Sequence, residues 1–236
     1  MTEGYTSSVM RLCLALLFLW SPPAAGTVSG KVGAPEGAAQ KRLRAKLYGG
    51  DAVAGRKDAD PTLAVVWLEG VAAPAKTESK NAVIRQDGLE FRPRALAITV
   101  GSKVDFPNDD DLFHNVFSFS KSNRIELGSY PKGESKSVVF DKKGLVDLRC
   151  EVHKHMRAFI HVFDHPYFAV AAADGGYSIP NVPPGKYTLV VWKEFFDPVR
   201  RDVEVNADGA KVDVTLSALL DRPADLTVGA ACCDAR

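Results

Sequence analysis

Residues 150–156, with the sequence CEVHKHM, bring together side chains that bind transition metals. The thiol of Cys150 is followed by the imidazole of His153 and then by the thioether of Met156, at intervals of three residues. Thiolate, imidazole and thioether favour copper or zinc over magnesium and calcium. A short turn between two strands can fold three such side chains around one point. This stretch therefore predicts a metal site.

The ligand types favour copper. A blue-copper site combines one thiolate, two imidazoles and a weak axial thioether. The second imidazole must come from elsewhere, and His114 is the best candidate because it begins a predicted strand after an acidic turn. A zinc site would more often use a second cysteine or a third imidazole. His155 could supply that imidazole, so zinc stays open. Any one of the four residues Cys150, His153, Met156 and His114, taken alone, would be interpreted as structural. All four together at this spacing favour a copper site.

The strands on both sides of the turn must position these side chains. Val146, Leu148 and Cys150 alternate with polar residues and so point to one face. Cys150 then lies at the end of a core-facing row, and residues 158–162 resume a strand after the turn. The sequence therefore predicts a metal-binding turn at the end of a hairpin.

The rest of the chain has the pattern of an all-β protein. Short segments of alternating apolar residues recur between Gly, Pro, Asn and Asp. No stretch of ten or more residues has a convincing helical period. This pattern predicts a β-sandwich or barrel. The clearest predicted strands are residues 96–100, 103–106, 137–140, 187–192 and 212–216.

The segments FPNDDDLFHNVFSF (106–119) and LRCEVHKHM (148–156) resemble the cupredoxins, the plastocyanin- and amicyanin-like blue copper proteins. The resemblance covers residues 82–163. It implies a Greek-key sandwich that holds one type 1 copper per chain and transfers single electrons. It also implies a role for Asn115, which would support the site from outside the ligand set. The ligands carried over by the resemblance are His114, Cys150, His153 and Met156.

Charged residues near the ligands depart from the usual cupredoxin pattern. Glu151 follows the cysteine, and Lys154 and His155 lie between the last two ligands. Many electron carriers have apolar residues there. A charged rim could alter the choice of partner or the reduction potential.

A second resemblance involves the segment DGGYSIPNVPPGKYTL (174–189), which is similar to the carboxypeptidase regulatory-like, or prealbumin-like, β-sandwich. Its first strands would be residues 26–32 and 64–69, which precede the cupredoxin region. We therefore predict that the cupredoxin is inserted into this second sandwich. The predicted organisation is a signal peptide (1–26), first strands of the second sandwich (27–75), the cupredoxin domain (76–165), the remainder of the second sandwich (166–217) and a flexible tail (218–236).

The N-terminus has the pattern of a secretory signal. Arg11 precedes an apolar run, residues 12–20, and the small residues SPPAAG follow. The run is too short to span a bilayer, and no later segment is long enough to do so. We therefore expect a periplasmic or secreted protein. Cys232 and Cys233 lie in the polar tail, where their role is open, and Cys150 is not expected to form a disulfide.

Composition narrows the function classes. The chain is 46% hydrophobic and 25% charged, with a net charge of +1, so no nucleic-acid surface is indicated. An enzyme is not expected, because four protein ligands leave no open metal position. The acidic turn 109–111 is interpreted as solvated, and His161 and His165 as structural.

The main hypothesis is an exported one-electron carrier whose redox partner is unidentified. One alternative is a protein that binds or delivers copper without redox traffic. The other is an interaction module with a structural metal, in which the second sandwich contacts a protein or a glycan.

Overall fold

The computed structural model describes residues 24–34, 64–74 and 77–217. These residues form strands joined by turns and bends, without a helix, which confirms the predicted all-β fold. Accordingly, the described part holds no helix with the length and hydropathy needed to cross a bilayer. Most of the predicted signal peptide and the tail with Cys232 and Cys233 lie outside the described residues.

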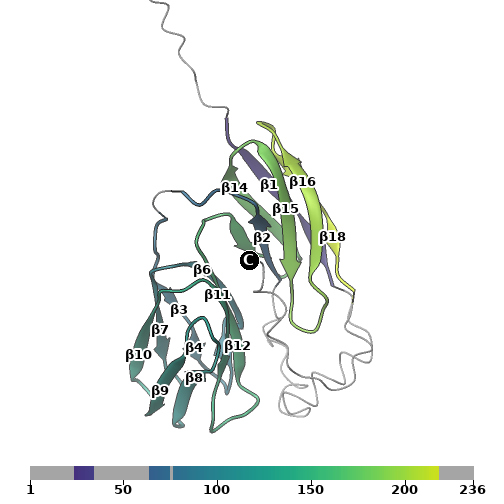
Figure 1. The fold of residues 1–236 in the computed structure, drawn as a ribbon. Coiled ribbons are helices and arrows are strands. Elements are labelled where there is room, and N and C mark those ends of the chain that lie inside the picture. The colour runs from purple at the N-terminus through teal and green to yellow at the C-terminus, as the bar shows by residue number, and fades with distance from the viewer. Residues whose placement is uncertain (1–23, 35–63, 75–76, 218–236) are drawn as a thin grey trace, which may run out of the picture.

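The middle of the chain forms one body, drawn in teal in Figure 1, whose two main sheets enclose a core. One sheet has the strand order β6-β12-β11-β8-β9 and the other the order β10-β7-β3, with β4 and β5 as a small separate pair. The strands are β3 (Ala82–Val83), β4 (Arg85–Gln86), β5 (Phe91–Arg92), β6 (Ala95–Thr99), β7 (Ser102–Pro107), β8 (His114–Ser118), β9 (Ile125–Tyr130), β10 (Ser135–Phe140), β11 (Gly144–Arg149) and β12 (Arg157–Phe163).

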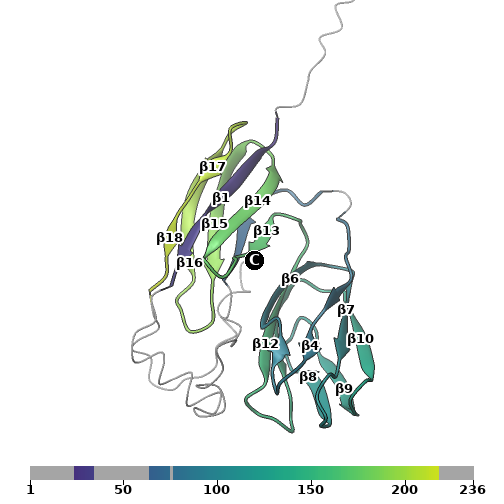
Figure 2. The same ribbon diagram turned by 180° about the vertical axis from the view of Figure 1, so that it is seen from behind.

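The second body combines strands from both ends of the described chain. Its two sheets have the orders β14-β1-β17, with β18 also paired to β1, and β13-β2-β15-β16. Figure 2, the view from behind, shows β1 beside β14 in this body. The strands are β1 (Gly26–Gly33), β2 (Val65–Glu69), β13 (Phe168–Val170), β14 (Gly176–Val182), β15 (Gly185–Trp192), β16 (Val199–Val205), β17 (Ala210–Lys211) and β18 (Val214–Thr215).

Strand pairing follows the alternation of the sequence. In β2, Val66 and Leu68 face the core of the second body, whereas Val65 and Trp67 face the opposite side. In β11, Val146 and Leu148 are fully buried in the core of the first body, as their spacing predicts. A shift of register by one residue would turn each of these rows to the opposite face of its sheet.

A third apolar cluster lies between the two bodies. Val65 and Trp192 of the second body pack with Ala95 and Phe159 of the first. The rings of Phe159 and Trp192 meet edge to face with centroids 5.0 Å apart, an arrangement that adds to the gain from burial alone. The two bodies therefore share a packed interface.

β1 and β2 pair with strands that follow residue 163, as they must if the first body is inserted into the second. The chain leaves the second body after β2, forms the first body, and returns at β13. The domain boundaries at 75/76 and 165/166 stay predictions, and the first of them lies outside the described residues.

Candidate metal centre

Three of the predicted ligands converge at one end of the first body. His114 begins β8, while Cys150 and His153 lie on the turn between β11 and β12. Their potential ligand atoms all lie within 4.8 Å of one another, and in the described residues this is the only such group of His, Cys, Asp or Glu. His114 is fully buried, and Cys150 is 2% exposed.

The distances place the two imidazoles and the thiol around a common point. The Nδ1 atoms of His114 and His153 are 2.9 Å apart, and Cys150 Sγ lies 3.9 Å from His114 Nδ1. A tetrahedral metal about 2.0 Å from each nitrogen and about 2.3 Å from sulfur would separate such atoms by roughly 3.3 and 3.6 Å. The residues therefore fit a metal ion after adjustments of a few tenths of an ångström.

Backbone hydrogen bonds close the turn on itself. The Met156 amide donates to the His153 carbonyl at 2.8 Å, and the Cys150 amide donates to the Met156 carbonyl at 3.4 Å. Met156 is 1% exposed and belongs to the same core cluster as Cys150. Its backbone and its burial place it beside the other ligands, and its role as axial ligand stays a prediction.

Asn115 ties the turn to the neighbouring strand. Its Oδ1 accepts a hydrogen bond from the Glu151 amide at 2.7 Å, and the residue is 4% exposed. Glu151 directly follows Cys150, so this bond fixes the backbone that carries the thiol against β8. This is the contact that a supporting residue outside the ligand set would make.

The structure adds a residue that the sequence did not single out, Asp110. Its Oδ2 lies 2.9 Å from Nε2 of His114, while Nδ1 of the same ring faces the other ligands. A carboxylate on the far nitrogen fixes the orientation and tautomer of a metal-binding imidazole. The Asp110 carboxylate also accepts hydrogen bonds from the amides of Gly88 and Leu89, at 2.6 and 2.8 Å.

The electrostatics of Asp110 agree with an ionised carboxylate. Burial acts to raise its pKa, but hydrogen bonds from Leu89, His114 and Gly88 outweigh this effect and lower the pKa below its ordinary value. The two neighbouring aspartates instead form ion pairs at the surface, Asp109 with Arg85 and Asp111 with Lys132. The interpretation of 109–111 as a solvated turn is therefore wrong for Asp110, whose side chain is only 13% exposed.

His155 lies outside the group of converging ligand atoms. Its Nε2 donates to the Leu89 carbonyl at 3.1 Å, and its ring centroid is 6.2 Å from that of His153. The third imidazole that the zinc alternative would use is therefore turned to the backbone. Burial, followed by the nearby imidazoles of His114 and His155, lowers the pKa of His153, which favours its neutral, metal-binding form.

Three exposed apolar residues lie next to the ligands in sequence. Leu112 and Phe113 precede His114, and Val152 precedes His153. These three side chains are 49%, 59% and 58% exposed. Large apolar side chains that are exposed in a contiguous patch are typical of a surface that contacts another protein.

Comparison with known proteins gives partial matches to this chain. The methylamine utilization protein MauL of Methylorubrum extorquens is 28% identical over 91 residues, which cover 38% of this chain and 78% of that protein. The family model of polysaccharide lyase family 4, domain II, matches residues 157–213. That model differs from the predicted carboxypeptidase regulatory-like family, so the latter resemblance stays a prediction.

Three solved structures are also similar to part of the chain. Amicyanin from Paracoccus versutus is 20% identical, covering 41% of this chain and 96% of its own, with a TM-score of 0.33. A purple cupredoxin from Nitrosopumilus maritimus is 26% identical over 34% of this chain and 98% of its own, with a TM-score of 0.30. The copper-containing nitrite reductase of Thermus scotoductus is 28% identical, with a TM-score of 0.34, over 39% of this chain and only 25% of its own.

Each of these matches covers less than half of this chain. None of them therefore assigns the whole chain to a family.

Proposed function

We propose that this protein is an exported, cupredoxin-like protein that binds one type 1 copper ion and carries single electrons. The observation that supports this most is the convergence of His114 Nδ1, Cys150 Sγ and His153 Nδ1 within 4.8 Å. One thiolate with two imidazoles is the equatorial ligand set of a blue-copper site, and the buried Met156 would be the weak axial ligand. When bound, copper would supply one-electron chemistry between Cu(II) and Cu(I).

The protein part of this function is to hold the ligands still. Asp110 fixes the His114 ring, and Asn115 fixes the backbone after Cys150. Both contacts exist between protein groups alone, so the ligand positions depend little on the oxidation state of the metal. A site of this kind would gain or lose an electron with little rearrangement.

The partner we propose is another redox protein. The exposed side chains of Leu112, Phe113 and Val152 would take part in this contact, beside the charged residues Glu151 and Lys154. The partial likeness to a methylamine utilization protein favours a partner that takes part in the use of methylamine. The signal-like N-terminus favours a site of action outside the cytoplasm.

The first test is to bind copper. Residues 27–236 are expressed, one equivalent of Cu(II) is added, and the visible and electron paramagnetic resonance spectra are recorded. An intense thiolate-to-copper band with narrow hyperfine splitting is expected. A colourless protein, or one that prefers Zn(II), would contradict the proposal.

Two substitutions test the ligand roles. Cys150→Ala should abolish the coloured site, since thiolate is the strong ligand, whereas Met156→Leu should keep copper and shift the reduction potential. A fully coloured Cys150→Ala protein would show that the assignment is wrong. Copper delivery is distinguished from electron transfer by affinity, because a carrier holds both Cu(II) and Cu(I) and a donor releases one of them.

A further inference from the structure

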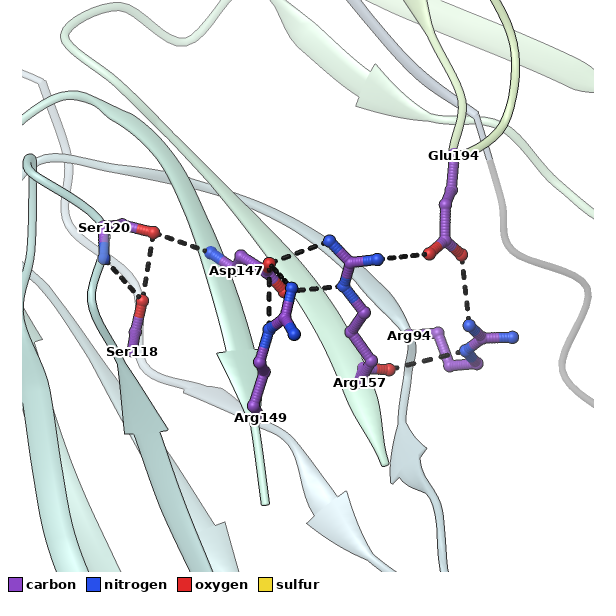
Figure 3. A network of polar contacts seen from close by, with 7 residues as sticks. All are labelled: Arg94, Ser118, Ser120, Asp147, Arg149, Arg157 and Glu194. Atoms are coloured by element: carbon purple, nitrogen blue, oxygen red, sulfur yellow. Dashed lines mark hydrogen bonds and ion pairs between the residues drawn. The ribbon is translucent and has the colours of Figure 1, made fainter. Parts of the chain in front are cut away.

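The second body reaches toward the metal-binding turn through one buried carboxylate, Glu194. This residue follows β15 by two positions, and its side chain is 4% exposed. Its Oε2 accepts a hydrogen bond from Arg94 at 3.1 Å, and its Oε1 lies 3.4 Å from Nη1 of Arg157. Figure 3 shows the Glu194 carboxylate between these two arginines of the first body.

Arg157 continues this contact toward the metal-binding turn. It directly follows Met156, and its Nε and Nη2 donate to the two carboxylate oxygens of Asp147, both at 2.8 Å. Asp147 also accepts from Arg149, the residue before Cys150, at 2.8 Å. Arg149 and Arg157 are paired across β11 and β12, so this network joins both strands at the base of the turn 150–156.

The positive charges of the arginines explain why a carboxylate from the second body is needed in this network. Within the first body, Arg149 and Arg157 share the carboxylate of Asp147, whereas Arg94 donates to the Arg157 carbonyl. Two of those arginines face each other across adjacent strands, a pairing that is destabilising without counter-charge. Glu194 supplies the second carboxylate, and a buried charge of this kind is tolerated only when it is paired.

The surrounding packing holds Glu194 in place. Trp192, two residues earlier, packs edge to face on Phe159, and the guanidinium of Arg157 lies 4.7 Å from the centroid of the same Phe159 ring. The Arg94 carbonyl accepts a hydrogen bond from the Phe159 amide at 2.8 Å. The carboxylate, both arginines and the aromatic pair therefore form one contact between the two bodies.

We propose that Glu194 is a positioning residue through which the second body fixes the geometry of the metal-binding turn. This inference rests on the proposed function, because the turn is taken to hold copper. The chain of contacts runs from Glu194 to Arg157, the residue after the predicted ligand Met156. It continues through Asp147 to β11, which ends one residue before Cys150. The second body is then a part of the copper site's support.

The test compares copper-loaded Glu194→Gln with the wild-type protein. The substitution keeps size and removes charge. We expect a changed ratio of visible bands, changed hyperfine splitting and a loss of Cu(II) affinity of roughly tenfold or more, as for other residues that orient metal ligands. Affinity is measured by competition with a chelator, and circular dichroism checks the fold. Glu194→Asp should restore part of the effect.

Two control variants separate this role from general stability. Glu69→Gln removes the exposed ion pair with Arg200 within the second body and should leave the copper spectrum unchanged. Trp192→Phe loosens the packing between the bodies without removing an ionic group. A Trp192→Phe spectrum shifted as much as that of Glu194→Gln would overturn the proposal, because docking alone would then set the turn.

A second variant keeps the proposal testable if Glu194→Gln does not fold. Arg157→Lys keeps the charge but loses the forked contact with Asp147 and the reach to Glu194. It should shift the spectrum in the same direction. An unchanged spectrum in either folded variant overturns the positioning role, whereas a wild-type protein that binds no copper overturns the proposed function itself.

Discussion

At the scale of single residues, three adjacent aspartates have different environments. Asp109 and Asp111 form surface ion pairs, whereas Asp110 turns inward to His114 and to the amides of Gly88 and Leu89. Nothing in the sequence DDD separates the middle residue from the others. The segment 87–90, which lies next to Asp110 only in the folded protein, makes the difference.

This difference gives a prediction at the residue scale. Asp110→Asn should weaken Cu(II) binding by roughly tenfold to a hundredfold, because the His114 ring loses the carboxylate that orients it. Asp111→Asn is the matched control, since that side chain is 86% exposed and should not affect affinity. Chelator competition measures both. Equal affinities for the two variants would show that Asp110 does not support the site.

At the scale of elements, the turn 150–156 depends on its neighbours for its shape. Its own backbone bonds close it, while Asn115 on β8 holds the Glu151 amide. β8 and β11 are joined by the pair Phe117 and Arg149, so the two ligand-bearing elements are adjacent. The distance of thirty-six residues between His114 and Cys150 is closed by this sheet pairing.

Asn115→Ala tests that support in the metal-free protein. Loss of the bond to Glu151 should lower the free energy of unfolding by about 1–2 kcal/mol, measured by chemical denaturation. The copper spectrum of the loaded protein should change as well. Asn123→Ala, which removes a similar bond to the Lys142 carbonyl, should lower stability without changing the spectrum. A spectral change in both variants would contradict a specific role for Asn115.

At the scale of the whole molecule, His161 makes the interface between the two bodies sensitive to acid. Its ring packs against Trp67, Phe163 and Trp192, and its Nε2 is buried without a hydrogen-bond partner among the described residues. Burial lowers its pKa from 6.5 to about 3. The unfolded chain therefore takes up a proton at a higher pH than the folded protein does.

The sign of the pH dependence follows from that shift. The contribution of neutral His161 to stability is fully present above pH ~6.5 and is lost as the pH falls toward ~3. Between these values, the free energy of unfolding should decrease by up to about 1.4 kcal/mol per pH unit. His161→Phe should remove this part of the slope in metal-free protein. Identical slopes in both proteins would show that folding does not lower the pKa of His161.

The predicted insertion of the first body into the second can also be tested at this scale. Limited proteolysis should yield a stable fragment near residues 76–165, with 26–72 still bound to 166–217 because β1 and β2 pair with the strands of that segment. Mass spectrometry of the separated products identifies the fragments. Free release of residues 26–72 would contradict an insertion.

The sequence by itself determined the all-β class and the residues at the metal-binding turn. Strand alternation and ligand chemistry are local, and both can be read from spacing within a few residues. It also singled out His114 as the best candidate for the second imidazole, and Asn115 through a resemblance. Only the tertiary structure decided that Asp110 supports His114 and that Glu194 reaches Arg157, because both contacts join segments that meet only on folding. The periodic pattern of a sequence does not predict which residue a carboxylate will contact. Its role is therefore decided by the elements that pack around it.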